Sequence, residues 1–281
     1  MKNTLACLII TILVATGCST TEKPSAPYLE QGEGYVEVKG GKIWYGIMGE
    51  GRNTPLLCLH GGPGGTSSGY YNFAELSKDR PVILFDQLGT GRSDHHQDTS
   101  LLHVDLFVEQ VKAITTALEL DEFYLVGGSW GTALGLEYYT KYPEGVKGIV
   151  FNSPYFSTQV WTDDADQLVA ALPDSIQLAI QVAERDSVFN TEAYDAANTF
   201  FARKHGRRKE RIKHPNDSVP SERNSFIYNY MWGPSEFTAT GTLRDYDNLN
   251  NLKKVKVPTL FTTGEFDEAR PETVSELSRM V

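Results

Sequence analysis

Apolar and polar positions follow two different rhythms along the chain. In residues 34–38 and 43–48 apolar side chains occupy about every second position on either side of a glycine pair, which predicts a β-hairpin. Strands expected to be buried on both faces read as short continuous apolar runs, at 55–59, 81–85, 123–126, 146–151 and 258–263. Helical periodicity at 104–118 and 132–141 separates several of these runs. The pattern therefore predicts a mostly parallel sheet with helices on both faces.

The rhythm changes between residues 153 and 251. Helical stretches there are polar and aromatic, and a basic run occurs at 203–213. Because the buried-strand pattern resumes only afterwards, we expect residues 153–251 to form a helical cap inserted between two strands of one sheet. The core is then expected to comprise residues 34–152 and 252–281. Within the cap, the basic run is predicted to be a solvated helix face, since the surrounding chain is acidic.

Residues 1–17 have the features of a secretory signal peptide. A lysine at position 2 precedes an apolar stretch at 5–14 that is shorter than the roughly 20 residues a membrane span needs. The stretch leads into Cys18 in the manner of a bacterial lipobox, so Cys18 is expected to carry lipid and the polar residues 18–33 to form a tether. We expect a protein of the bacterial cell envelope, periplasmic or at the cell surface, whose lipid anchor is its only membrane attachment; plain secretion is the alternative.

Composition narrows the classes of partner and cofactor. The 281 residues carry a net charge of −10, with a pI of about 5.1, which argues against general binding to nucleic acid phosphates. Cys7 lies in the signal and Cys18 at the lipobox, which leaves Cys58 in an apolar run as an expected buried side chain. No cluster of His, Cys and carboxylate residues has metal-ligand spacing, so neither a metal nor an organic cofactor is expected.

The segment Gly127–Gly131 (GGSWG) fits the pattern G-x-S-x-G. This pattern puts a serine on a sharp, strained turn from a strand into a helix, with small residues on both sides so that the backbones do not clash. Here it directly follows the apolar run 123–126 and directly precedes a predicted helix. We therefore predict that Ser129 is a nucleophile and that the amide of Trp130, at the helix N-terminus, faces a developing oxyanion. A tight structural turn is the alternative.

A glycine-rich loop, HGGPGG at 60–65, follows the run 55–59. Its glycines allow backbone N–H groups to approach a ligand closely, and no Gly-Lys-Ser/Thr follows, so it is not a phosphate-binding loop. Its position suits the second half of an oxyanion hole, with the N–H of Gly62 as the predicted donor. His60 is expected to be a structural, hydrogen-bonded residue of the turn rather than a base.

Taken together, five segments resemble the proline iminopeptidases. They are HGGPGG at 60–65, DQLGTGRSD at 86–94, GGSWGTAL at 127–134, GPSEFTATGTLRDYD at 233–247 and TGEFDE at 263–268. The resemblance runs in consistent order from about residue 34 to the end of the sequence. It implies a serine aminopeptidase of the α/β-hydrolase fold with a helical cap, which releases an N-terminal proline, or another small or apolar residue, from peptides. Close relatives act as amino-acid amidases.

The resemblance implies roles for three carboxylates. In the family the acid of the triad follows the strand after the cap, which here is Asp267, and the order Ser before Asp is that of the α/β-hydrolase triad. Relatives bind the free amino group of the substrate with glutamates at positions that match Glu236 and Glu268. A buried ammonium needs a fixed opposite charge. Either glutamate could instead form a hydrogen bond that joins the cap to the core. Aromatic side chains available to wall a pocket for the proline ring are Trp130, Tyr155, Phe156, Trp161 and Trp232.

The base of a serine hydrolase is usually a histidine, and in this fold it comes last in the chain. The six histidines are His60, His95, His96, His103, His205 and His214. All precede Asp267, and the 14 residues after it (281 − 267) are too few for a helix of about 11–12 residues and a strand of about 5–6. We therefore expect a chain truncated relative to its family, without the last strand and helix and without the triad histidine.

Three functions remain open at this point. The first is a serine aminopeptidase that releases N-terminal proline, or another small or apolar residue, through an acyl-enzyme on Ser129. The second keeps the enzyme class but acts as an amino-acid amidase or esterase. The third is a catalytically inactive remnant that lacks the triad histidine. The expected partners are small peptides or amino-acid amides with a free N-terminus.

Overall fold

The computed structural model describes residues 27–209 and 222–281. The predicted signal peptide and the predicted lipidation site Cys18 lie outside these residues, as do His214 and the end of the basic run. In the described part of the chain, no helix is long and apolar enough to cross a membrane.

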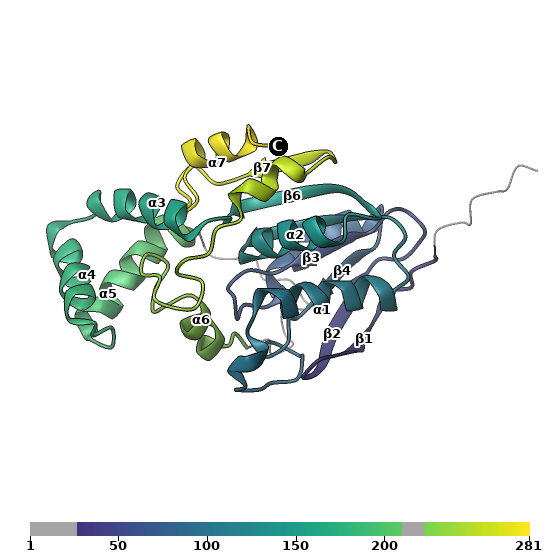
Figure 1. Cartoon of the computed structure of the whole chain (residues 1–281), viewed down its shortest axis with the longest axis horizontal. Helices are drawn as coiled ribbons and strands as arrows, with labels where there is room; N and C mark the ends of the chain where they lie inside the picture. Colours follow the sequence, from purple (N-terminus) through teal and green to yellow (C-terminus); the bar gives the residue numbers. More distant parts are fainter. Residues whose placement is uncertain (1–26, 210–221) are drawn as a thin grey trace, which may run out of the picture.

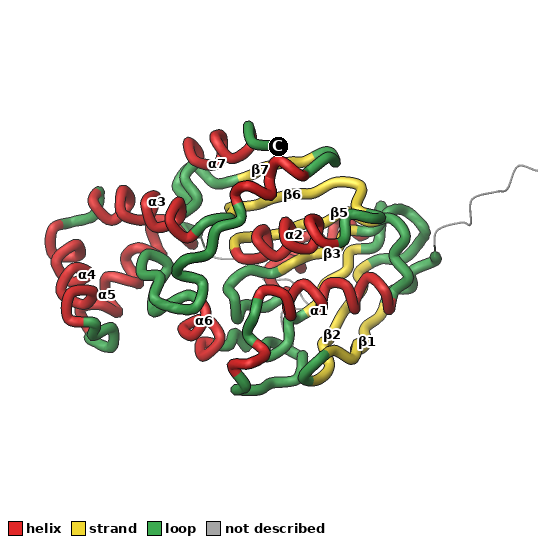
Figure 2. The backbone as a smooth tube through the Cα atoms, viewed as in Figure 1, coloured by secondary structure: helices red, strands yellow, loops and turns green. Residues whose placement is uncertain are grey.

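The described residues contain a seven-stranded sheet in the order β1-β2-β4-β3-β5-β6-β7 (Figures 1 and 2). Its strands are β1 Gly32–Val38, β2 Gly41–Met48, β3 Leu56–Leu59, β4 Val82–Phe85, β5 Phe123–Ser129, β6 Val146–Pro154 and β7 Thr259–Thr262. The pairs β1–β2 and β2–β4 are antiparallel, and the four pairs from β4 to β7 are parallel. The predicted hairpin and the mostly parallel sheet are therefore confirmed.

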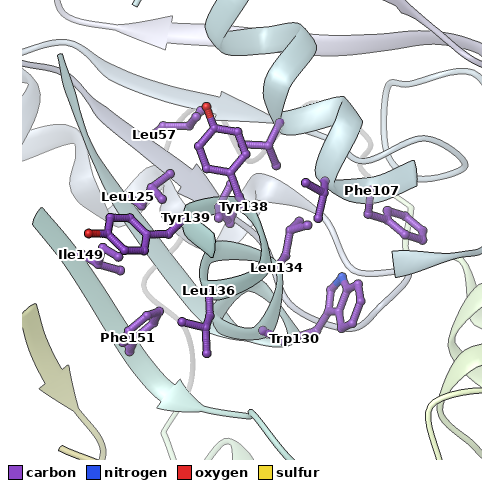
Figure 3. Packing of buried hydrophobic residues seen from close by; sticks show 14 of the residues in the cluster. Leu57, Phe107, Leu125, Trp130, Leu134, Leu136, Tyr138, Tyr139, Ile149 and Phe151 are labelled. Carbon is purple, nitrogen blue, oxygen red and sulfur yellow. The ribbon is translucent and has the colours of Figure 1, made fainter. Parts of the chain in front are cut away.

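Both faces of the central strands are buried because their side chains point alternately into two packed layers. Helices α1 (Val104–Ala117) and α2 (Trp130–Lys141) cover one face, and the 3₁₀ segment η1 (Ser67–Lys78) covers the other. In β3, Leu57 belongs to the layer of α1 and α2, whereas the next residue, Cys58, packs on the side of η1. Figure 3 shows strand side chains packed against those of α2 in the main core. Cys58 is buried and unpaired, as predicted.

The helices of the cap lie between β6 and β7 in the sequence and gather at the end of the sheet where β6 leads into α3 (Figure 1). They are α3 Thr158–Ala170, α4 Asp174–Asp186, α5 Glu192–Phe201, the π-helical η3 Ala202–Gly206 and α6 Ser225–Met231. The cap has a small hydrophobic core of its own around Tyr194, Phe201 and Phe237. A helical insertion that packs on itself is thus held over one edge of the sheet.

The basic run differs from its prediction. Its first residues belong to η3, but residues 207–209 lie outside any helix. His205 is buried, whereas Arg203 and Arg207 on either side of it are exposed. The prediction of a solvated helix face is therefore wrong for the histidine of this run, which is buried.

After the cap the chain returns to the sheet through η5 (Leu249–Lys254) and β7, and then forms α7 (Pro271–Ser278) beside β7. A proline at the start of α7 is favourable because its missing N–H would have no helical partner there. The carboxyl ends of parallel strands meet at one edge of a sheet, so the loop 263–270 after β7 lies near the turn after β5. This edge carries the candidate site.

Candidate active site

Ser129 lies on the turn that joins β5 to α2. Its backbone has φ 51° and ψ −124°, a strained conformation typical of a serine nucleophile at such a turn. Two glycines make the turn possible. A Cβ on Gly131 would lie 1.9 Å from the carbonyl oxygen of Leu59, and a Cβ on Gly127 would lie 2.4 Å from the carbonyl oxygen of Gly131. Close backbone contacts therefore require both glycines of the G-x-S-x-G pattern.

The glycine-rich loop 60–65 packs directly against this turn. A Cβ on Gly61 would lie 3.2 Å from the Cβ of Ser129, so a larger residue would push the two segments apart. Gly62 lines the same cavity as Ser129. Among the described residues, neither the amide of Gly62 nor that of Trp130 has a hydrogen-bond acceptor. Two free N–H donors thus lie beside the serine, which is what an oxyanion hole requires.

His60 begins this loop and is fully hydrogen-bonded. The amide of Gln87 donates to its Nε2 at 2.9 Å, and its Nδ1 donates to the carbonyl oxygen of Gly61 at 2.9 Å. Gln87 in turn donates from its side chain to the carbonyl oxygen of His60 at 2.9 Å. With no free lone pair on the ring, His60 is a structural residue of the turn, as predicted, and not a base.

Asp267 follows β7 and lines the same cavity as Ser129. Its Oδ2 accepts hydrogen bonds from the hydroxyl of Ser153 at 2.6 Å and the amide of Gly264 at 3.4 Å, and its Oδ1 accepts one from the amide of Ala269 at 3.0 Å. Ser153 lies in the last residues of β6 and has φ 47°. Sequence analysis missed Ser153, and its place at the carboxyl end of an apolar run was the one signal that pointed to it.

Glu236 from the cap and Glu268 from the loop after β7 share a cavity of about 630 Å³ with Ser129 and Asp267. Burial raises the pKa of Glu236 above its ordinary value. Burial also raises the pKa of Glu268 well above its ordinary value, and the carboxylates of Glu236 and Asp267 raise it further. The guanidinium of Arg223, which also lines the cavity, opposes both pKa shifts. Two poorly solvated carboxylates that repel each other favour a cation between them.

Of the five candidate aromatic residues, Trp161 lines this cavity. Its indole N–H donates to the carbonyl oxygen of Glu236 at 2.9 Å and so holds the backbone that carries this carboxylate. All five belong to the main hydrophobic core, and four of them do not line the cavity: Trp130, Tyr155, Phe156 and Trp232. The sequence could not separate these cases, because an aromatic residue serves equally well in a core or in an apolar pocket wall.

His205 is a residue of the cavity that sequence analysis did not identify. Its Nδ1 lies 3.1 Å from the carbonyl oxygen of Phe266, and its Nε2 has no hydrogen-bond partner among the described residues. The next residue, Gly206, packs on Glu268, since a Cβ on Gly206 would lie 3.0 Å from the Oε1 of that carboxylate. The cap therefore contacts the loop that carries both Asp267 and Glu268.

No histidine within residues 27–209 or 222–281 is hydrogen-bonded to the Ser129 hydroxyl or to the Asp267 carboxylate. The same residues hold no group of three or more His, Cys, Asp or Glu side chains arranged to bind a metal ion. The groups brought together are a serine on a strained turn, two free amide donors, one hydrogen-bonded acid and a pair of half-buried glutamates.

A strained serine at a strand-to-helix turn, an acid after a later strand and a cap over a parallel sheet define a serine hydrolase of the α/β-hydrolase fold. Residues 54–279 match the family model for this fold. The crystal structure of VinJ has a TM-score of 0.81 and 29% sequence identity to this chain, and the match covers 89% of this chain and 87% of VinJ.

Similar proteins narrow the class further. A proline iminopeptidase of Heyndrickxia coagulans is 41% identical over 250 residues, which cover 88% of this chain and 87% of the relative. A proline iminopeptidase of Lactiplantibacillus plantarum is 35% identical over 238 residues, which cover 83% of each chain. The crystal structure of the Mycobacterium smegmatis proline iminopeptidase has a TM-score of 0.76 at 28% identity and covers 89% of this chain and 87% of its own. The chain belongs to the proline iminopeptidase family of serine hydrolases.

Proposed function

We propose that this protein releases N-terminal proline, or another small or apolar residue, from short peptides through an acyl-enzyme on Ser129. The observation that carries the proposal is a shared cavity. It is lined by Ser129 on its strained turn, by Asp267 and by the two half-buried glutamates Glu236 and Glu268. A nucleophile beside an anionic pocket suits a substrate whose scissile carbonyl is next to a free ammonium group.

In the proposed reaction, the Ser129 hydroxyl oxygen attacks the first peptide carbonyl carbon and a base takes the hydroxyl proton. The carbonyl oxygen becomes negative and receives hydrogen bonds from the free amides of Gly62 and Trp130. The C–N bond then breaks, the proton passes to the leaving amine, and water later hydrolyses the ester. Asp267 would orient the base, which in this class is a histidine. Its three hydrogen bonds hold the carboxylate for that role.

Glu236 and Glu268 would bind the substrate ammonium. Burial raises the pKa of each carboxyl, so a cation that restores the ionised form gains more here than at the surface. An N-acylated peptide has no such charge and would leave the carboxylates uncompensated. The proposed substrates are therefore peptides or amino-acid amides with a free N-terminus, and no nucleic acid is expected to bind.

Hydrolysis of prolyl-anilide by the wild type and the Ser129→Ala variant tests the proposal. We expect the variant to lose at least about a thousandfold in kcat/KM, because it removes the nucleophile. Acetylation of the substrate amine should reduce turnover by the wild type by about a hundredfold or more. Comparison of kcat/KM for proline amide, prolyl peptides and simple esters separates a peptidase from an amidase or esterase. Unchanged turnover in the variant would remove Ser129 from the mechanism.

A second candidate is an amine-binding protein without turnover. The observation in its favour is that no described histidine contacts the Ser129 hydroxyl. An active-site phosphonate probe distinguishes the two. Saturable labelling of Ser129 supports the hydrolase, whereas binding of proline amide without any labelling supports the second candidate.

We further propose that Cys18 carries lipid and anchors the protein in the bacterial cell envelope. The support is the lipobox-like sequence before Cys18, which lies outside the described residues. Labelled fatty acid fed to expressing cells should enter the wild type and not the Cys18→Ala variant. Release of an unlabelled wild type into the medium would favour plain secretion.

A further inference from the structure

One buried acceptor in the cavity has no partner within the described residues. The side chain of His205 lies almost entirely out of solvent, since the residue is 8% exposed, and its ring packs on Phe201 with the centroids 5.0 Å apart. The carbonyl oxygen of Phe266 can only accept a hydrogen bond, so Nδ1 carries the proton and Nε2 presents a lone pair. Nε2 is shielded from solvent and makes no hydrogen bond. Buried polar atoms are rarely left unpaired, so this one calls for a ligand or another explanation.

The charge state of the ring limits what that ligand is. Burial lowers the pKa of His205, and the cations of Lys204 and Arg208 lower it as well, whereas the contact with Phe266 and the charge of Asp267 oppose the shift. The imidazole is therefore neutral near pH 7. A neutral ring whose Nδ1 proton is already donated can only accept at Nε2, and its partner must bring an N–H or O–H.

The position of His205 relates this acceptor to the amine end of the proposed site. Its π-helical segment η3 packs on the loop after β7, with Gly206 close to the Oε1 of Glu268. His205, Glu236 and Glu268 all line the cavity that contains Ser129. Short π-helical segments frequently occur at functional sites.

We propose that Nε2 of His205 accepts an N–H of the substrate ammonium, as a third acceptor beside Glu236 and Glu268. The inference rests on the proposed function, in which the ammonium lies between the two glutamates. N-terminal proline is a secondary ammonium with two N–H donors, which two glutamates satisfy. A primary ammonium has three donors, so the third acceptor favours substrates that begin with a residue such as alanine. His205 is thus a specificity residue that widens the substrate class beyond proline.

Binding measurements in the full chain test this without turnover. In a Ser129→Ala background, isothermal titration at pH 7 gives Kd for L-alaninamide and L-prolinamide. His205→Asn keeps a side-chain N–H near the place of Nδ1 for the Phe266 carbonyl but removes Nε2. We expect this change to weaken the binding of L-alaninamide by about tenfold, which is the effect of one lost hydrogen bond to a charged group. The binding of L-prolinamide should weaken by less than about twofold. The exposed His95, changed to Asn in the same background, is the matched control and should alter neither Kd.

Two results overturn the proposal: unchanged binding of both amides, and an equal loss for both, which indicates a merely structural role. His205→Gln serves if the Asn variant fails to fold, as judged by thermal unfolding. Its amide oxygen reaches toward the place of Nε2, so it should keep the wild-type preference for L-alaninamide, and loss of that preference contradicts the proposal. If the background protein binds neither amide, the amine site of the proposed function fails together with this inference. If it binds both and His205→Asn changes nothing, His205 alone loses its role.

Discussion

Two buried histidines show how differently the two walls of the cavity are built. On the sheet side, both ring nitrogens of His60 are hydrogen-bonded to backbone atoms. On the cap side, His205 has one ring nitrogen without a partner among the described residues. Two adjacent carboxylates in the loop after β7 differ in a similar way. Asp267 accepts three hydrogen bonds, whereas burial and the neighbouring carboxylates raise the pKa of Glu268.

The difference separates reaction from recognition in the proposed function. Asp267, which would orient the base, is fixed by hydrogen bonds that form without a ligand, so it needs little rearrangement when charge develops. Groups that would bind the amine are incomplete in the free protein, and an ammonium supplies what they lack. Such a site lowers the stability of the free protein and favours ligand binding, and both effects can be measured.

The largest expected effect is at the sheet-side wall, with Gly131→Ala. The added methyl group would lie 1.9 Å from the carbonyl oxygen of Leu59, so the turn or β3 must shift. We expect the free energy of unfolding to fall by about 3 kcal/mol and phosphonate labelling of Ser129 to be lost. Urea unfolding followed by circular dichroism measures the first effect. Gly69→Ala is the control, because a Cβ there meets nothing within 4 Å, and equal stability of the two variants would show that the turn adapts.

At the amine end of the cavity, Glu268→Gln should weaken the binding of L-prolinamide by about a hundredfold, or about 3 kcal/mol. The change removes one of two charges that face the ammonium in a poorly solvated site. Titration calorimetry in the Ser129→Ala background measures the affinity. Glu265→Gln alters an exposed glutamate of the same loop and should leave the affinity unchanged. If both variants bind alike, Glu268 does not contact the amine.

The same variant should be more stable than the wild type above neutral pH in the absence of ligand. Burial raises the pKa of Glu268 in the folded protein, so its contribution to stability is present at low pH and is lost as pH rises through the folded pKa. A tenfold change in the dissociation constant corresponds to about 1.4 kcal/mol, and we expect Glu268→Gln to gain about 1–2 kcal/mol at pH 8. Urea unfolding at pH 5 and pH 8 measures this. A gain that is equal at both pH values would point to packing rather than charge.

Much of the fold could be predicted because the apolar composition of each strand reflects its own burial. The runs 55–59, 81–85 and 123–126 are apolar at every position, and 146–151 and 258–263 at most or half of theirs, since helices cover both faces of the sheet. The G-x-S-x-G turn was predictable for a related reason, because two glycines are needed for backbone contacts made within a few residues of Ser129 and with the neighbouring strand β3. The burial of a strand and the close backbone contacts of a turn can therefore be predicted from the local sequence.

Residues whose surroundings are assembled from distant segments were harder to predict. His205 reads as part of a basic run, but its ring packs on Phe201 and contacts Phe266, which lies 61 positions further on. Trp130 and Trp161 are equally aromatic and both belong to the core, but of the two it is Trp161 that also lines the cavity. Ser153 carries no pattern of its own, and its partner Asp267 lies 114 positions further on.

Ser153 gives the smallest predicted effect and tests whether the hydrogen bonds to Asp267 matter individually. Ser153→Ala removes the donor at 2.6 Å and leaves the two amide donors in place, so kcat for prolyl-anilide should fall by about fivefold to tenfold, as expected for one hydrogen bond of about 1 kcal/mol. Ser153→Gly removes the same hydroxyl but tolerates φ 47° better, so it should be the more stable of the two variants in urea and equally slow. Wild-type kcat in the glycine variant would show that backbone strain, and not the hydroxyl, sets the contribution of Ser153.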